Sequence, residues 1–245
     1  MKLLVCISQA PDTTSRIAFT NDDREFDSNG VQYIVNPYDE WYALVRAIEL
    51  KEQQGGTVTT ITVGGAQCDP TIRKALAIGA DDAVRIDSEP TDAMQVARLI
   101  AGYANGKGFD VILCGKETID HNGAVVPAML AELLDCGFVA NATHLDVNGS
   151  EASVKREAAG GEENVTVTLP MVLSAAKGMA EQRIPNMRGI MSARTKPLTV
   201  EAATEESGSR IERFALPPEK GACKIIDAEN AAELIRLLRE EAKVI

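Results

Sequence analysis

The sequence is poor in aromatic residues and in residues that bind metals. Aromatic side chains make up 4% of the 245 residues, which leaves little for the stacking surfaces that bind single-stranded nucleic acid. The two histidines, His121 and His144, and the five cysteines show no metal-binding spacing, and no Cys-x-x-Cys pair occurs. An odd number of separate cysteines is typical of a reducing compartment rather than of a disulfide framework. We therefore expect no metal site.

Excess positive charge and long apolar runs are also missing. The formal net charge is −11, which argues against nucleic acid and anionic membrane surfaces as partners. No apolar stretch approaches the roughly 20 residues that a membrane-spanning helix needs. The first ten residues predict a strand and carry no signal-peptide pattern. These absences predict a cytoplasmic protein without membrane insertion.

What the sequence does have is a regular alternation of strands and helices. Apolar runs predict strands at residues 2–8, 57–65, 83–86 and 111–114, and helical periodicity predicts helices at 36–54, 69–78, 90–108 and 124–134. In the first helix we expect Asn36 to be the cap and Glu40 to stand at the third helical position. The alternation predicts an α/β fold with a doubly wound parallel sheet.

The pattern changes after about residue 140. Asn-Gly and Gly-Gly turns between short alternating runs predict an antiparallel hairpin at 143–177. A polar, proline-bearing stretch at 201–221 predicts an extended arm, and a helix capped by Asp227 follows, with Leu234, Leu237 and Leu238 on one face. We expect residues 1–200 to form a nucleotide-binding α/β domain and residues 201–245 an arm that packs on a partner.

The stretch from Val111 to Met129 predicts an anion site. An apolar strand ends at Cys114 and Gly115, and a helix follows shortly after Asp120. A turn between a strand and a helix N-terminus presents backbone N–H groups and the positive end of the helix dipole. From these residues alone, an ordinary connection between a strand and a helix is an equal alternative.

Other loops should meet this one at the carboxyl edge of the sheet, where ligands bind in doubly wound folds. No nucleotide-binding glycine motif or nucleophile elbow occurs. Asp120 and His121 are adjacent, but nothing supplies a nucleophile, so we predict a site that holds a nucleotide without cleaving it and no catalytic residues. The predicted nucleotide-binding residues are Gln9, Ala10, Asn36, Val63, Gly64, Cys114, Gly115, Asp120, His121, Asn122, Gly123, Ala124, Val125 and Val126.

Four stretches carry a family resemblance. In their order and spacing, "NPYDEWYALVRAIELKE", "GGAQCDPTIRKALAIGADDAVRI", "DVILCGKETID" and "EQRIPNMRGIMSARTKP" resemble the beta subunit of electron-transfer flavoprotein, over nearly the whole chain. The resemblance implies an adenine nucleotide alpha hydrolase-like domain without hydrolase activity. It also implies an alpha subunit that carries the redox FAD, and AMP, or a second FAD in bifurcating members, bound in the beta subunit.

The resemblance also assigns roles to residues. Gly115 to Val126 is similar to the loop around the nucleotide phosphate, but Ala124, Val125 and Val126 stand where ordinary members have Asn-Gln-Thr. AMP is expected over FAD, because a second flavin needs polar contacts along a longer pyrophosphate. Residues near 180–196 resemble the partner-recognition loop, and the expected docking residues are Glu181, Arg183, Ile184, Pro185, Met187, Ile190 and Met191.

The resemblance implies a non-catalytic electron carrier subunit. It would support the FAD of the alpha subunit and dock acyl-CoA dehydrogenases or similar flavin dehydrogenases of fatty acid beta-oxidation. A quinone oxidoreductase would then pass the electrons to the respiratory chain. The alternative is a stand-alone nucleotide-binding protein of the universal-stress or ATP-pyrophosphatase-like class.

Overall fold

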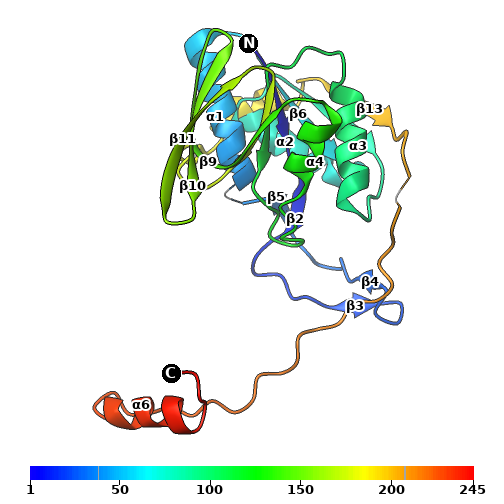
Figure 1. Cartoon of the computed structure of the whole chain (residues 1–245). Helices are drawn as coiled ribbons and strands as arrows, with labels where there is room; N and C mark the ends of the chain where they lie inside the picture. Colours follow the sequence, from blue (N-terminus) through cyan, green and yellow to red (C-terminus); the bar gives the residue numbers. More distant parts are fainter. Residues whose placement is uncertain (38, 207) are drawn as a thin grey trace.

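Strands and helices alternate along the chain as the apolar pattern predicts (Figure 1). The computed structural model describes residues 1–37, 39–206 and 208–245. Tyr38, within the predicted first helix, and Ser207, within the predicted extended arm, lie outside the described residues. The helices are α1 (Asp39–Gln54), α2 (Asp69–Ile78), α3 (Ala93–Ala104), α4 (Val126–Leu133), α5 (Met187–Ala193) and α6 (Ala231–Glu240). A short 3-10 helix, Ala66–Cys68, precedes α2.

A nine-stranded mixed sheet runs through the protein in the order β11-β10-β9-β12-β8-β1-β6-β7-β13. Its strands are β1 (Lys2–Cys6), β6 (Thr57–Val63), β7 (Asp82–Asp87), β8 (Val111–Gly115), β9 (Gly137–Asn148), β10 (Glu151–Ala158), β11 (Gly161–Thr168), β12 (Met171–Ala175) and β13 (Leu198–Ala202). All neighbours from β9 to β13 in this order are parallel, whereas β10 pairs antiparallel with β9 and β11. The predicted hairpin therefore extends one edge of a parallel sheet. The prediction is wrong for its last part, because β12 lies within residues 143–177 but is a parallel strand between β9 and β8.

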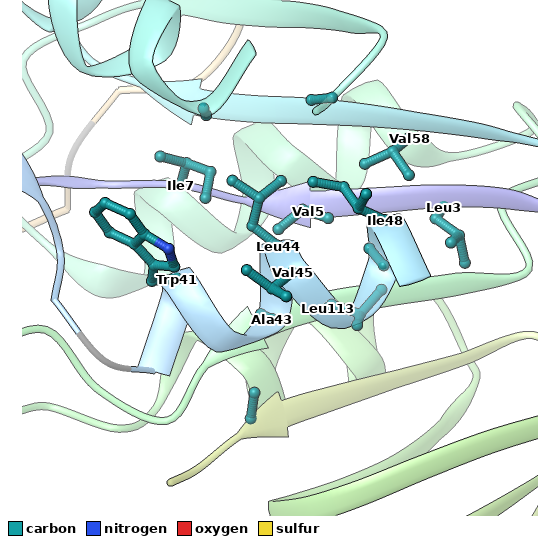
Figure 2. Packing of buried hydrophobic residues seen from close by; sticks show 14 of the residues in the cluster. Leu3, Val5, Ile7, Trp41, Ala43, Leu44, Val45, Ile48, Val58 and Leu113 are labelled. Atoms are coloured by element: carbon teal, nitrogen blue, oxygen red, sulfur yellow. The ribbon is translucent and has the colours of Figure 1, made fainter. Parts of the chain in front are cut away.

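Buried side chains form one core on each face of the sheet. In β1, Leu3 and Val5 belong to one cluster, and Leu4 and Cys6 belong to the other, because successive residues of a strand point to opposite faces. Helices α1 and α2 cover the first face, and α3 and α4 cover the second. Figure 2 shows the first cluster, where α1 packs Leu44 and Ile48 against the sheet. This arrangement confirms the predicted α/β fold with helices on both faces.

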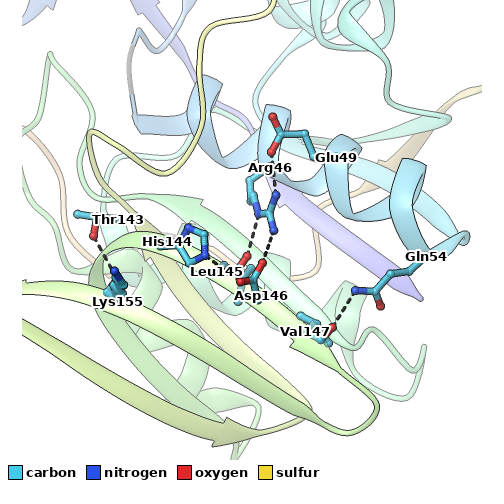
Figure 3. Close-up of polar contacts among 9 residues, drawn as sticks. All are labelled: Arg46, Glu49, Gln54, Thr143, His144, Leu145, Asp146, Val147 and Lys155. Atoms are coloured by element: carbon cyan, nitrogen blue, oxygen red, sulfur yellow. Dashed lines mark hydrogen bonds and ion pairs between the residues drawn. The ribbon is translucent and has the colours of Figure 1, made fainter.

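A polar contact fixes the hairpin side of the sheet to α1 (Figure 3). The buried guanidinium of Arg46 donates from Nε to the backbone oxygen of Leu145 at 2.8 Å and from a terminal nitrogen to Asp146 at 2.9 Å. At the C-terminal end of α1, Gln54 donates to the backbone oxygen of Val147 at 2.7 Å. These contacts hold β9 against α1 through side chains that reach its backbone.

Two predicted helix caps are wrong. Helix α1 begins at Asp39, and the Asn36 side chain bonds to a distant loop instead of capping the helix. Helix α6 is capped by Asn230, which accepts from Glu233 N, whereas Asp227 accepts from Glu229 N in the preceding turn. In both places several residues near the helix end could act as the cap, and tertiary contacts or local geometry select among them.

The arm follows β13, which crosses the predicted domain boundary at residue 200. Backbone N–H groups of Gly208 and Ser209 donate to the Asp92 carboxylate at 3.0 and 3.1 Å. Phe214 stacks on Phe19 with ring centroids 4.9 Å apart. Beyond Phe214 the chain leads to α6, which stands away from the rest of the molecule in Figure 1. Among the described residues, no helix is long and apolar enough to cross a membrane.

Candidate functional site

A cavity lies at the carboxyl edge of the sheet where the strand order reverses. From β1, the next strands β6 and β7 are added on one side, whereas β8 lies on the other side of β1. The loops after these four strands surround a cavity of about 480 Å³. Both the position and the size are typical of a ligand site in a doubly wound fold.

Most of the predicted nucleotide-binding residues meet in this cavity. The lining includes Gln9, Val63, Gly64, Cys114, Gly115, Asp120, His121, Gly123, Ala124, Val125 and Val126. The other three predicted residues are not part of the lining: Ala10 and Asn36 are fully buried behind it, and Asn122 lies in the loop but outside the wall. The structure thus places the predicted residues close together, although not all of them line the cavity.

Asn36 supports the loop that follows β8. It comes directly after β5 (Tyr33–Val35), which pairs with β2 (Gln9–Pro11). Its side-chain N–H donates to the backbone oxygen of Glu117 at 3.0 Å, and its side-chain oxygen accepts from the Ile119 N–H at 3.0 Å. A buried amide that satisfies one acceptor and one donor of a loop holds that loop in a single conformation.

The loop itself forms a turn before α4. The Asn122 N–H donates to the Thr118 oxygen at 2.8 Å, and the His121 N–H donates to the Asp120 carboxylate at 2.9 Å. Within the part of the chain that the structure describes, the N–H groups of Gly123, Ala124 and Val125 have no hydrogen-bond partner. All three residues line the cavity at the N-terminus of α4. These N–H groups are free to bind an anion.

Gly115 lets the end of β8 approach α1 closely. A Cβ at this position would lie 2.7 Å from Glu40 Cγ and 2.9 Å from the Glu40 backbone nitrogen. Distances below 3.0 Å to backbone atoms cannot be relieved by a rotamer change. A side chain at position 115 would therefore push the strand end and the helix start apart, and both border the cavity.

Glu40 is a buried carboxyl group in the cavity wall. Its two oxygens contact the N–H of Ser8 at 2.6 Å and the hydroxyl of Ser8 at 2.7 Å. Burial raises the pKa of Glu40 to about 8, although the hydrogen bonds from Ser8 act in the opposite direction. At neutral pH the group is therefore mostly protonated, and it adds little negative charge to the cavity.

Sequence reasoning missed the part of the wall that comes from β5 and from the loop after β7. Tyr33, Glu89 and Asp92 line the cavity on that side. The loop after β7 also ends at the carboxyl edge, so the rule that located the other loops could have located this one. Glu117 and Asp120 also line the cavity, and Lys116 forms an ion pair with Glu117 at 2.9 Å, so the charged lining is mainly acidic. In the residues that the structure describes, no group of three or more His, Cys, Asp or Glu side chains could hold a metal ion.

The segment predicted to dock partners exposes its apolar residues. The exposed fractions are 79% for Ile184, 73% for Met187, 42% for Ile190 and 67% for Met191. Of the other predicted residues, Glu181 is exposed, whereas Arg183 and Pro185 are partly buried. Exposed apolar side chains on neighbouring positions are typical of an interaction surface.

The same segment is held rigidly from behind. The Trp41 indole donates to the Arg183 backbone oxygen at 3.2 Å, and the Arg183 guanidinium forms two hydrogen bonds with Glu52 at 2.8 and 2.9 Å. Asn186 caps α5 by accepting from the Gly189 N–H at 2.9 Å. A Cβ on Gly189 would lie 2.3 Å from the Ala77 oxygen, so α5 packs directly on the backbone of α2.

Comparison with known proteins gives one consistent result. Residues 24–206 match the model of the electron transfer flavoprotein domain family. Over its full length the chain is 39% identical to the electron transfer flavoprotein subunit beta of Bacillus subtilis, covering all of that protein. It is 36% identical to the protein of the same name from Syntrophomonas wolfei, covering 98% of it, and 29% identical to the human protein of that name, covering 99% of it.

Proposed function

The chain belongs to the electron transfer flavoprotein family as a relative of its beta subunits, and we propose that it is the non-catalytic beta subunit of a cytoplasmic heterodimer. In this proposal the alpha subunit carries the redox FAD, and this chain supports the flavin and presents the complex to its redox partners. The observation that carries the proposal is the full-length similarity to electron transfer flavoprotein beta subunits. The alternative of a stand-alone nucleotide-binding protein gains no support from these observations.

We further propose that the cavity binds AMP. The partnerless N–H groups of Gly123, Ala124 and Val125 would hold the phosphate, and the α4 dipole would add a favourable field. AMP is preferred over a second FAD, because Ala124, Val125 and Val126 offer no side-chain hydroxyl or amide to bind along a longer pyrophosphate. Bound there, AMP supplies no redox chemistry and would act as a structural ligand.

The docking role is assigned to residues 181–191. The backbone that carries these exposed apolar side chains is held in place, so little backbone entropy remains to be lost on binding. The proposed partners are acyl-CoA dehydrogenases or similar flavin dehydrogenases of fatty acid beta-oxidation. Electrons would leave through a quinone oxidoreductase toward the respiratory chain.

The test of the proposed function is to co-express the chain with the alpha subunit and purify the complex. The nucleotides are then released by denaturation and identified by mass and by absorbance. We expect one FAD and one AMP per heterodimer. Two FAD molecules per heterodimer would show that this chain binds a second flavin instead of AMP. A chain that does not associate with the alpha subunit would overturn the proposal.

The position of the phosphate is tested by a substitution that the nucleotide-free fold can accommodate. A Cβ on Gly123 would contact only Val125, at 3.8 Å. Gly123→Val should therefore leave the fold intact but fill the space in front of the free N–H groups, and AMP occupancy should be lost. Asn122→Gly is the matched control, because Asn122 has a left-handed φ of 49° that glycine adopts readily. Full occupancy in Gly123→Val would place the phosphate elsewhere.

A further inference from the structure

Two thiols lie side by side in the wall of the cavity. Strands β1 and β8 are parallel neighbours, and Val5 pairs with Leu113, so the next residues, Cys6 and Cys114, stand beside each other. Both belong to the buried cluster on the face covered by α3 and α4, so their side chains project to the same side of the sheet. Both also line the cavity. We call these two residues the thiol pair.

The spacing of the two strands places the Cα atoms of the thiol pair within disulfide range. Neighbouring strands lie about 4.8 Å apart, which falls within the range of about 4.4–6.8 Å found between the Cα atoms of disulfide-bonded cysteines. The side chain of Cys114 is close enough to raise the pKa of Cys6. The other three cysteines are not strand neighbours of the pair. Cys68 also lines the cavity but belongs to the core on the opposite face, Cys136 follows α4 and packs against the same cluster, and Cys223 is in the arm.

We propose that Cys6 and Cys114 form a reversible disulfide when hydrogen peroxide enters the cavity, and that a bound nucleotide shields them. The Cys6 thiolate attacks one peroxide oxygen, which forms a sulfenic acid and releases hydroxide that is protonated to water. The Cys114 sulfur then attacks the sulfenic sulfur and displaces a second water. In total, two thiols are oxidised and one peroxide is reduced to two waters.

The rate of this reaction depends on the state of Cys6. The neighbouring Cys114 side chain, followed by burial, raises the pKa of Cys6 well above its ordinary value of 9.0. Since the thiolate is the reacting form, the pair is slow to react at neutral pH, and the rate should rise about tenfold per pH unit between pH 7 and pH 9. Parallel strands keep the two Cβ atoms farther apart than a relaxed disulfide prefers, so thiols should reduce the bond readily.

The disulfide would also act on the cavity. It joins the ends of the two strands that lead to Ser8 and Gly115, and both residues line the cavity. Drawing these ends together changes the space in front of the loop before α4. Oxidation should therefore weaken the binding of AMP, and reduction should restore it. This second effect rests on the proposed nucleotide site, whereas the disulfide itself does not.

The experiment treats the purified full-length chain with hydrogen peroxide at pH 8, blocks the remaining thiols by alkylation and digests the protein with trypsin. We expect a linked pair of peptides, residues 3–16 joined to residues 108–116, which dithiothreitol separates. Cys6→Ala and Cys114→Ala should each abolish the linked pair, and Cys136→Ala should retain it. Oxidation of Cys6 to a sulfinic acid without the link, or a link to Cys68 instead, would overturn the proposal.

Adding AMP before peroxide tests the shielding by nucleotide separately from the formation of the disulfide. Saturating AMP should slow formation of the linked peptides several-fold, and guanosine monophosphate is the control for non-specific protection. An unchanged rate with AMP would overturn the shielding and would also place AMP outside this cavity. A linked peptide pair in the absence of any nucleotide supports the disulfide whichever of these results is found.

Discussion

The sheet with its helices, residues 1–202, and the arm, residues 203–245, use apolar side chains in opposite ways. In the sheet region, called the body here, leucines such as Leu4 and Leu113 are fully buried in two cores. In the arm, Leu216, Ile225 and Ile235 are all exposed. Full burial of such a side chain contributes about 1.5–3 kcal/mol. The body therefore carries its own stability, and the arm can obtain this contribution only by binding another surface.

Hydrogen bonds divide the arm itself into two parts. Contacts at Glu205, Gly208 and Phe214 bind the first part to the body: Gln95 donates to the Glu205 oxygen, Asp92 accepts from Gly208, and Phe214 donates to the Asp23 oxygen. Among the described residues from 215 to 245, no hydrogen bond or ion pair reaches the body. The first part positions the arm, and the second part, which ends in α6, is left to contact a partner.

The largest expected effect comes from removing the second part. A chain that ends at Gly221 keeps the contacts of Asp92 and Phe214 but lacks α6. We expect complete loss of co-purification with the alpha subunit, while circular dichroism and the melting temperature of the body stay close to those of the full chain. A chain that ends at Gly208 is the comparison, since it also loses the Phe214 contacts. A heterodimer of normal stability from either chain would break the contrast between body and arm.

The next effect concerns Glu40 in the body. Because its folded pKa is about 8 and its ordinary value is 4.5, the folded state keeps a proton that the unfolded state loses between these pH values. The contribution of Glu40 to stability is thus greatest below pH 4.5 and falls as pH rises to 8, by at most about 5 kcal/mol. Glu40→Gln should flatten this fall and be more stable than the parent at pH 8.5 in urea titrations. If the free energy of unfolding depends on pH in the same way in both proteins, Glu40 is ionised in the folded state.

A smaller effect separates two glycines at the same cavity. Gly115→Ala brings a Cβ against the Glu40 backbone and should lower the free energy of unfolding by about 1–3 kcal/mol. Gly123→Ala meets only Val125 at an ordinary contact distance and should leave stability nearly unchanged. Chemical denaturation of both variants measures the difference. If Gly115→Ala is as stable as the parent, the close packing of β8 on α1 does not limit the fold.

The smallest effect sharpens the comparison, because Met187 belongs to the body but is exposed like the apolar residues of the arm. Met187→Ala should leave stability and flavin content unchanged. It should weaken docking by about 1–3 kcal/mol, seen as slower electron transfer at limiting dehydrogenase concentration. Leu133→Ala, another exposed apolar substitution on the body, is the control. Equal rates for both variants and the parent would remove residues 181–191 from the docking surface.

The sequence predicts much of the fold, because the burial of a strand or helix determines which of its positions are apolar. Strands β1 and β8 are almost entirely apolar, since both of their faces are covered, and β6 is rich in β-branched residues. Strand β13 was missed, because it is an edge strand with mostly exposed residues and therefore has no apolar pattern. The hairpin could be predicted from its turn residues, since glycine permits the left-handed conformations at Gly149 and Gly160.

The candidate site is less predictable, because its support depends on contacts that are distant in the sequence. Asn36 was placed at a helix cap, which is the local role that its residue type favours. Its actual partners, Glu117 and Ile119, are 81 and 83 residues away. The burial that raises the pKa of Glu40 likewise depends on how β8 packs against α1. The common edge of the strands can be predicted from the sequence, but these cross-links between loops cannot.

The fixing of α5 has a consequence for sequence variation. The helix is held on its inner side by the close approach of Gly189 to Ala77 and by Arg73, which donates to the oxygens of Ala193 and Lys196. Met187 and Met191 take no part in these contacts and face outward. Substitutions at these two positions can accumulate at little cost in folding, whereas position 189 tolerates almost none. Selection for a new binding partner can therefore alter the outer residues one at a time without first having to rescue the fold.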